Sequence, residues 1–77
     1  MADERDVERI VDKETFVKTL RRAADAIESG EGFRIQIKGE RFTIPADAIL
    51  AIEHEREEDD GKITEEVELQ LRWSYSV

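Results

Sequence analysis

Few side chains in this sequence could carry out covalent or acid–base chemistry. His54 is the single histidine, and a histidine can act as a general base or as a metal ligand. There is no cysteine, and no serine lies in the Gly-x-Ser-x-Gly pattern of a nucleophile elbow. We interpret His54 as a structural residue at the margin of a sheet, packed beside Val67. We therefore expect no enzymatic activity, no catalytic residue, no resident metal and no cofactor.

Glutamates in the second half of the chain could bind a cation. The strand pattern described below places Glu53 opposite Glu68 and Glu55 opposite Glu66 on an outer sheet face. Like charges that face each other across strands are destabilising. One interpretation is a cation-binding face, because carboxylates suit hard ions. The alternative, which we favour, is a salt-adapted surface neutralised by loosely held K⁺ or Na⁺, because no bend in the chain gathers six oxygens around one point.

The charge balance is strongly acidic. The 77 residues carry 20 Asp and Glu against 12 Lys and Arg, a formal net charge of −8. Such a charge costs stability through self-repulsion, which molar salt removes by shortening the Debye length to about 3 Å. This favours a halophilic protein over an ordinary acidic bacterial one. No apolar stretch is long enough to span a bilayer and the start lacks a signal-peptide core, so we expect a cytoplasmic protein with no membrane partner.

One amphipathic helix is expected before the strands begin. Apolar residues such as Phe16 and Leu20 recur at helical spacing and form a single stripe. Asp12 suits the N-cap, and Gly30 suits the left-handed residue that follows a helix end. The residues before the helix leave open a short additional strand near residues 7–11.

The first hairpin is expected directly after Gly30. Phe33, Ile35 and Ile37 alternate with polar residues, which predicts a strand with one apolar face. The glycine of Gly39-Glu40 favours a two-residue turn that pairs Ile37 with Phe42. Pro45 should end the second strand, since it has no N–H to donate.

The second hairpin is expected around Asp60-Gly61, a pair typical of type I′ turns. The alternation that ends in Trp73 fixes its apolar face. We expect one helix packed on one face of a four-stranded antiparallel sheet, in a single α+β domain spanning residues 1–77. The predicted facing pairs are Asp59–Lys62, Arg56–Glu65, His54–Val67, Ile52–Leu69, Leu50–Leu71 and Ala48–Trp73, with Trp73 as a core anchor over the small Ala48.

Charge on the outer faces predicts how the protein could bind a partner. The first hairpin is net positive there, but the overall charge opposes nucleic acid and no aromatic residue is present to stack bases.

A sheet positive at one hairpin and negative at the other complements a two-fold copy of itself. We therefore predict a non-enzymatic, self-associating module, a homodimer. The alternatives are plain solvation of both patches, or a small-ligand or cation site on the outer face or between helix and sheet. The predicted surface comprises Arg34, Gln36, Lys38, Arg41, Ile49, Glu53, Glu55, Glu66, Glu68, Gln70 and Arg72.

Four short segments carry a resemblance to a known family. They are residues 20–27, Ser29-Gly30, Ile52-Glu53 and residues 69–73. Together they resemble the amphi-Trp domain, over roughly residues 13–73. That family comprises small proteins common in haloarchaea, with no established function. The resemblance implies a salt-loving source and brings no active-site residue with it.

Overall fold

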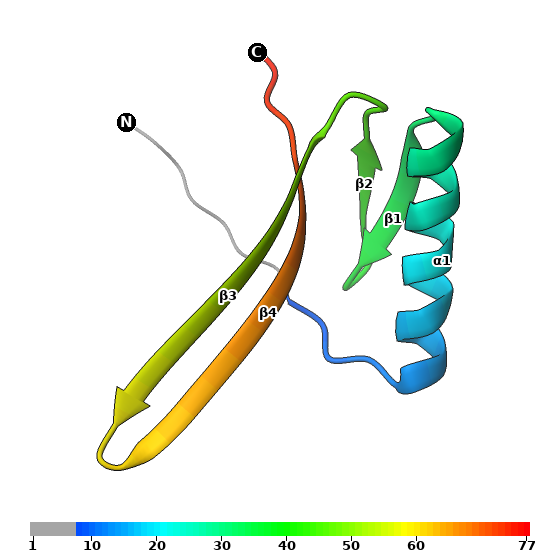
Figure 1. Cartoon of the computed structure of the whole chain (residues 1–77). Helices are drawn as coiled ribbons and strands as arrows, with labels where there is room; N and C mark the ends of the chain where they lie inside the picture. The colour runs from blue at the N-terminus through cyan, green and yellow to red at the C-terminus, as the bar shows by residue number, and fades with distance from the viewer. Residues whose placement is uncertain (1–7) are drawn as a thin grey trace. The chain divides into compact units, whose positions relative to one another are not determined.

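The computed structural model describes residues 8–77 and contains one helix and four antiparallel strands (Figure 1). This confirms the α+β class and the two hairpins. The chain divides into two compact units, the first ending at Asp47 and the second comprising Ala48–Val77. The elements are α1 (Lys13–Ser29), β1 (Phe33–Ile37), β2 (Glu40–Ile44), β3 (Ile49–Asp59) and β4 (Lys62–Arg72).

Helix α1 begins and ends at the predicted caps. The Asp12 carboxylate accepts a hydrogen bond from the Thr15 backbone N–H at 2.9 Å. Hydrogen bonds from Thr15 hold the pKa of Asp12 below its usual value. Gly30 has a φ of 74°, and its conformation closes the last turn onto the Ala26 and Ile27 carbonyls. Within residues 8–77, no helix combines the length and apolar character that crossing a bilayer would require.

The segment before α1 contains no strand where it is described. Residues 8–12 have no regular secondary structure, so the optional strand near residues 7–11 is not present over residues 8–11. Val7, the remaining residue of that prediction, lies outside the described residues. Because Asp12 already serves as the N-cap, the chain enters the helix directly from this segment.

The first hairpin turns one residue earlier than predicted. Ile37 faces Glu40, so Lys38-Gly39 forms the turn and not Gly39-Glu40. Lys38 has a φ of 49° and Gly39 a φ of 80°, the two left-handed conformations of a type I′ turn. Phe42 therefore faces Ile35 instead of Ile37. This shift moves each partner by two positions, so the apolar residues stay on one face.

The first unit packs its helix beside β1 (Figure 1). The Arg22 guanidinium donates a hydrogen bond to the Arg34 carbonyl oxygen at 2.7 Å and links the two elements. Ile44, at the end of β2, is 5% exposed and is the one hydrophobic residue classed as buried among residues 8–77. Gly32 lies against it, since a Cβ at Gly32 would come within 2.8 Å of the Ile44 carbonyl oxygen.

The second hairpin has the predicted register. Asp60-Gly61 forms the turn with φ angles of 51° and 77°, and Asp59 faces Lys62. The ladder ends at Ile49–Arg72, so the predicted pair Ala48–Trp73 lies one step beyond it. The other predicted pairs are confirmed: Arg56–Glu65, His54–Val67, Ile52–Leu69 and Leu50–Leu71.

The two hairpins form separate two-stranded sheets, which corrects the predicted four-stranded sheet. β2 ends at Ile44 and is followed by Pro45, which cannot donate to a ladder. A turn at residues 46–47 then redirects the chain before β3. Consequently, each strand within residues 8–77 is hydrogen-bonded along one edge only, to the other strand of its hairpin.

Candidate interaction surface

The residues of the predicted interaction surface lie on two different sheets. Four belong to the first hairpin, where Arg34 faces Thr43 and Gln36 faces Arg41. Lys38 is not a strand residue as predicted, because it occupies the turn. The structure therefore gives two polar surfaces in place of one. The members on the β3–β4 hairpin are Ile49, Glu53, Glu55, Glu66, Glu68, Gln70 and Arg72.

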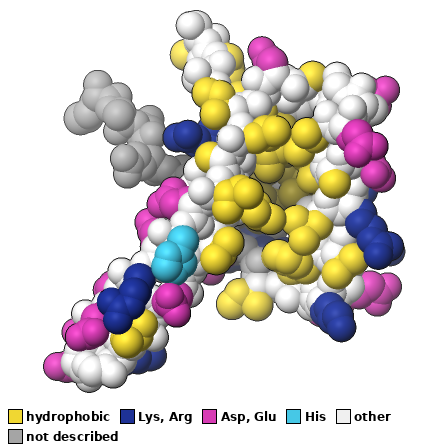
Figure 2. All heavy atoms as spheres, viewed as in Figure 1, with side chains coloured by type: hydrophobic (Ala, Val, Ile, Leu, Met, Phe, Trp, Pro, Cys, Tyr) yellow, Lys and Arg dark blue, Asp and Glu magenta, His cyan; other side chains and the backbone are white. Residues whose placement is uncertain are grey.

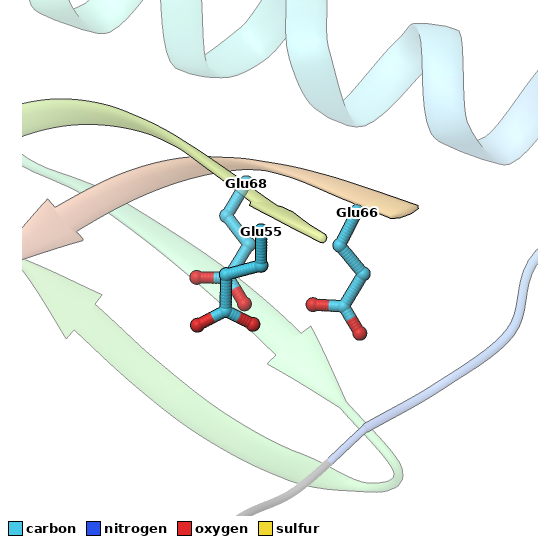
Figure 3. Close-up of side chains that lie close together, drawn as sticks. All are labelled: Glu55, Glu66 and Glu68. Carbon is cyan, nitrogen blue, oxygen red and sulfur yellow. The ribbon is translucent and has the colours of Figure 1, made fainter. Parts of the chain in front are cut away.

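The acidic surface of the β3–β4 hairpin forms as the register predicts. Glu53 faces Glu68, and Glu55 faces Glu66. The carboxylate groups of Glu55, Glu66 and Glu68 project from the same side of the hairpin, with oxygens within 4.8 Å of one another (Figure 3). Gln70 partly offsets the repulsion, because its Nε2 donates to Glu68 Oε2 at 2.8 Å and to Glu53 Oε2 at 3.1 Å.

Crowding of carboxylates changes the protonation of Glu55. A hydrogen bond with the Glu53 carboxyl group, together with the negative charges of Glu53, Glu68 and Glu66, raises the pKa of Glu55 above its ordinary 4.5. The folded hairpin thus holds a proton on Glu55 more tightly than the unfolded chain does. The contribution of Glu55 to stability is therefore fully present below the pKa that it has in the unfolded chain. It is lost as the pH rises through the higher pKa of the folded hairpin.

The same carboxylates are the residues best placed to hold a cation. Two of them, Glu55 and Glu66, line a hollow of about 460 Å³ together with Arg56, Glu57 and Thr64. Ca²⁺ takes six to eight oxygen ligands, and Arg56 adds a positive charge at the edge of the hollow. Glu55 and Glu66 are exposed and Glu68 is half-buried. The three carboxylates could therefore attract a loosely held cation more readily than enclose one.

His54 has a partner that the sequence analysis missed. Its Nε2 lies 3.1 Å from Glu65 Oε1, and the His54 side chain is 56% exposed. Arg56 faces Glu65 as predicted, but its guanidinium pairs with Glu58 at 3.6 Å. The diagonal geometry of antiparallel strands explains the His54–Glu65 contact, because a side chain can reach the residue two positions from its facing partner. Arg56 and Glu58 lie two positions apart on β3, so their side chains share one face. His54 faces Val67, so Glu65 was within reach.

The apolar face of the β3–β4 hairpin, which was predicted to be buried, is exposed. A two-stranded ribbon offers no second layer of its own, so it cannot cover one of its faces. Charged side chains gather towards the turn of this hairpin (Figure 2). Four exposed apolar residues of this face lie nearer the other end: Leu50 (55% exposed), Ile52 (79%), Val67 (71%) and Leu69 (54%). Ile63, also exposed, lies beside the turn.

Comparison with known proteins assigns the chain to a family. The family model of the Amphi-Trp domain matches residues 2–76. The chain belongs to the Amphi-Trp family. This confirms the resemblance carried by the helix, the Ser29-Gly30 end and the terminal strand. No curated protein and no solved structure matches this Amphi-Trp chain.

Trp73 of the Amphi-Trp chain lies just past the last strand. β4 ends at Arg72, and Trp73 is 36% exposed. The prediction of a core anchor paired with Ala48 is therefore wrong, since neither residue joins the ladder. Trp73 instead extends the exposed apolar character of β4, and the next residues, including Tyr75 (80% exposed), continue it.

Substituting Glu55 with glutamine should stabilise the Amphi-Trp chain at neutral pH and low salt. The change removes one negative charge from a group of facing carboxylates. Because glutamine does not ionise, the variant should lose less stability than the original chain as the pH rises. We expect the melting temperature to rise by a few degrees. In molar KCl the gain should shrink, because salt screens exposed charges.

Thermal melts in low and molar KCl at several pH values would measure this effect. Glu57→Gln is the matched control, because Glu57 faces Thr64 and not another acid. Equal gains for both variants would show that total charge matters and that the facing arrangement does not.

Proposed function

We propose that this Amphi-Trp chain is a non-enzymatic interaction module that self-associates as a homodimer in a salt-rich cytoplasm. The supporting observation is the exposed apolar row on β3–β4, formed by Leu50, Ile52, Val67 and Leu69. A single two-stranded hairpin is marginally stable in water, and a contiguous apolar patch on a soluble protein usually marks an interaction site. A second copy offers the same row, and contact between the two rows would remove part of each from water.

Charge supports the salt-rich setting. Two copies that each carry a net charge of −8 repel each other at low ionic strength. Molar salt screens that repulsion, while the burial of apolar surface remains favourable. The proposed dimer should therefore become tighter as KCl is added.

The non-enzymatic part of the proposal rests on residue chemistry. The sequence has no cysteine, and its single histidine is exposed and lies beside Glu65. An exposed His–Glu pair has no neighbouring nucleophile in a Gly-x-Ser-x-Gly turn to activate. Binding, rather than catalysis, fits these residues best.

Self-association can be tested by light scattering over a range of protein concentrations in low and molar KCl. We expect a dimer whose Kd falls with added KCl. Leu69→Ser should raise that Kd about tenfold, because an apolar side chain in the proposed contact becomes polar. A strict monomer at high protein concentration in molar KCl would contradict the proposal.

The control for this substitution is Ile10→Ser. Ile10 is 92% exposed and lies before α1, outside the β3–β4 hairpin. Its replacement should leave the Kd unchanged. If both serine variants weaken the dimer equally, the apolar row of β3–β4 is not the contact.

A second candidate function is cation binding at Glu55, Glu66 and Glu68. The close approach of their oxygens, within 4.8 Å, favours it. Calorimetric titration with Mg²⁺ and Ca²⁺ tests this candidate against Glu66→Gln. Saturable binding that the variant loses would support a cation site, and heats that merely scale with ionic strength would support the salt-adapted surface.

A further inference from the structure

We infer that the two copies join edge to edge through β4, in an antiparallel ladder whose two-fold axis passes through Leu69. This inference rests on the proposed self-association and specifies its geometry. Within residues 8–77, β4 is hydrogen-bonded along one edge only, to β3. An edge strand presents a row of N–H and C=O groups that can pair with another strand.

The hairpin register shows which groups of β4 point outward. Asp59 and Lys62 flank the two-residue turn, and such flanking residues exchange both backbone hydrogen bonds. Bonding alternates along an antiparallel ladder, so the N–H and C=O groups of Val67, Leu69 and Leu71 point away from β3. A ladder between two copies must therefore pair odd-numbered residues with odd-numbered residues.

A two-fold axis at Leu69 meets this condition and matches the apolar face. Leu69 faces Leu69 of the second copy, and Val67 faces Leu71 of the second copy. Side chains on one face of facing strands come within contact distance, and apolar pairs stabilise the strand pair. The exposed apolar rows of two hairpins thus become one continuous surface on a four-stranded sheet. A sheet of this size can be stable where a lone hairpin is marginal.

The opposite face is matched in charge by the same axis. Glu66 faces Arg72 of the second copy, and the symmetry creates this pair twice. Glu68 faces Gln70 of the second copy, so a carboxylate meets an uncharged amide. Opposite charges across strands are stabilising, whereas like charges are destabilising. Within its own chain Glu66 faces Glu55, so Arg72 from the second copy supplies the positive charge that Glu66 lacks there.

Neighbouring positions of the axis match less well. An axis at Glu68 would place that carboxylate opposite itself. An axis at Val67 would place Glu66 opposite Glu68. An axis at Gln70 would pair Glu68 with Arg72, but the shared ladder would then cover only residues 68–72 of β4 instead of residues 66–72. The axis at Leu69 combines the ion pairs with the longer overlap.

The other free edge, on β3, is a poorer candidate. On the polar face its row contains Glu53, Glu55 and Glu57, without a cation among them. Any two-fold axis between Glu53 and Glu58 therefore places acid opposite acid. The asymmetry between the two edges favours β4.

Charge reversal tests the register through residues on the polar face. Glu66→Arg and Arg72→Glu should each raise the dimer Kd about tenfold, because each turns the two ion pairs into like-charge pairs. The double variant Glu66→Arg/Arg72→Glu should restore the Kd of the original chain. Sedimentation velocity measures all three at one KCl concentration, chosen so that the original chain is a dimer. Glu57→Arg is the control on β3 and should not weaken the dimer.

A cysteine crosslink tests the position of the axis, and the chain has no native cysteine to interfere. In the proposed ladder, facing Cα atoms at Leu69 lie about 5.5 Å apart, within the range a disulfide spans. Leu69→Cys should therefore form a covalent dimer on mild oxidation. Leu71→Cys should not, because its copies would lie four residues apart along the strands, about 14 Å.

The outcomes separate the two proposals. A dimer in which charge reversal has no effect and Leu69→Cys forms no crosslink would overturn the β4 ladder, and self-association would stand. Failure of the double variant to recover the original Kd would also overturn this register. A monomer under all conditions would overturn both proposals.

Discussion

Replacing Ile44 with alanine is expected to lower the free energy of unfolding by about 2–5 kcal/mol. Ile44 is 5% exposed, and its strand pairs it with Phe33. The truncation removes buried methyl groups and leaves a cavity that a small core cannot refill. Urea unfolding followed by circular dichroism would give the value from the shift of the midpoint.

Ile10→Ala is the matched control, because the same side chain is 92% exposed there. Surface substitutions usually change stability by less than about 0.5 kcal/mol. A similar loss for both variants would mean that the first unit does not depend on Ile44.

Replacing Gly32 with alanine is expected to cost about 1–3 kcal/mol, the range typical of overpacking. The new Cβ would come within 2.8 Å of the Ile44 carbonyl oxygen, which belongs to the backbone and cannot rotate away. The β2 end would have to move, and Ile44 with it. Thermal melts would show a lowered transition.

Gly30→Asn separates crowding from backbone conformation. Gly30 has a φ of 74°, and a Cβ added there would meet no neighbouring atom within 4 Å. Asparagine adopts the left-handed conformation at little cost, so this variant should melt close to the original chain. If Gly32→Ala were as well tolerated as Gly30→Asn, the close approach to Ile44 would have no energetic weight.

The parts of the fold governed by local chemistry could be predicted from the sequence. The Asp12 cap requires only a carboxylate before an amphipathic stretch. The second hairpin follows from Asp60-Gly61, which fixes the facing residue for every position of β3 and β4. The acidic surface was predictable for the same reason, since its like-charged pairs are a direct consequence of that register.

The position of the first turn could not be predicted, because a glycine alone does not set its own place in a turn. The pattern suggests Gly39 as the first turn residue, but it is the second, after Lys38. The two hairpins in fact use the same conformation, with φ angles of 49° and 80° at Lys38-Gly39 and 51° and 77° at Asp60-Gly61. Lysine is an uncommon residue for a left-handed conformation, so its type gave no signal.

The arrangement of strands beyond each hairpin could not be predicted either. Alternation shows which face of a strand is apolar, but not which strand lies next to it. The register of the second hairpin also does not decide which acid a long side chain contacts. Arg56 faces Glu65, yet its guanidinium lies near Glu58, and Glu65 is taken by His54.

The row of acids on β3 has a consequence for aggregation. A sheet can keep growing only if both of its edge strands can pair with further copies. A four-stranded sheet joined through β4 would have β3 as the edge strand on both sides. In every two-fold register centred between Glu53 and Glu58, the acids of this row would then meet the same acids on an incoming copy. Charges on an edge strand are a recognised way of preventing uncontrolled strand addition. The costly repulsion on this hairpin would thus act as a gatekeeper that ends growth at two copies and keeps the protein from forming fibres.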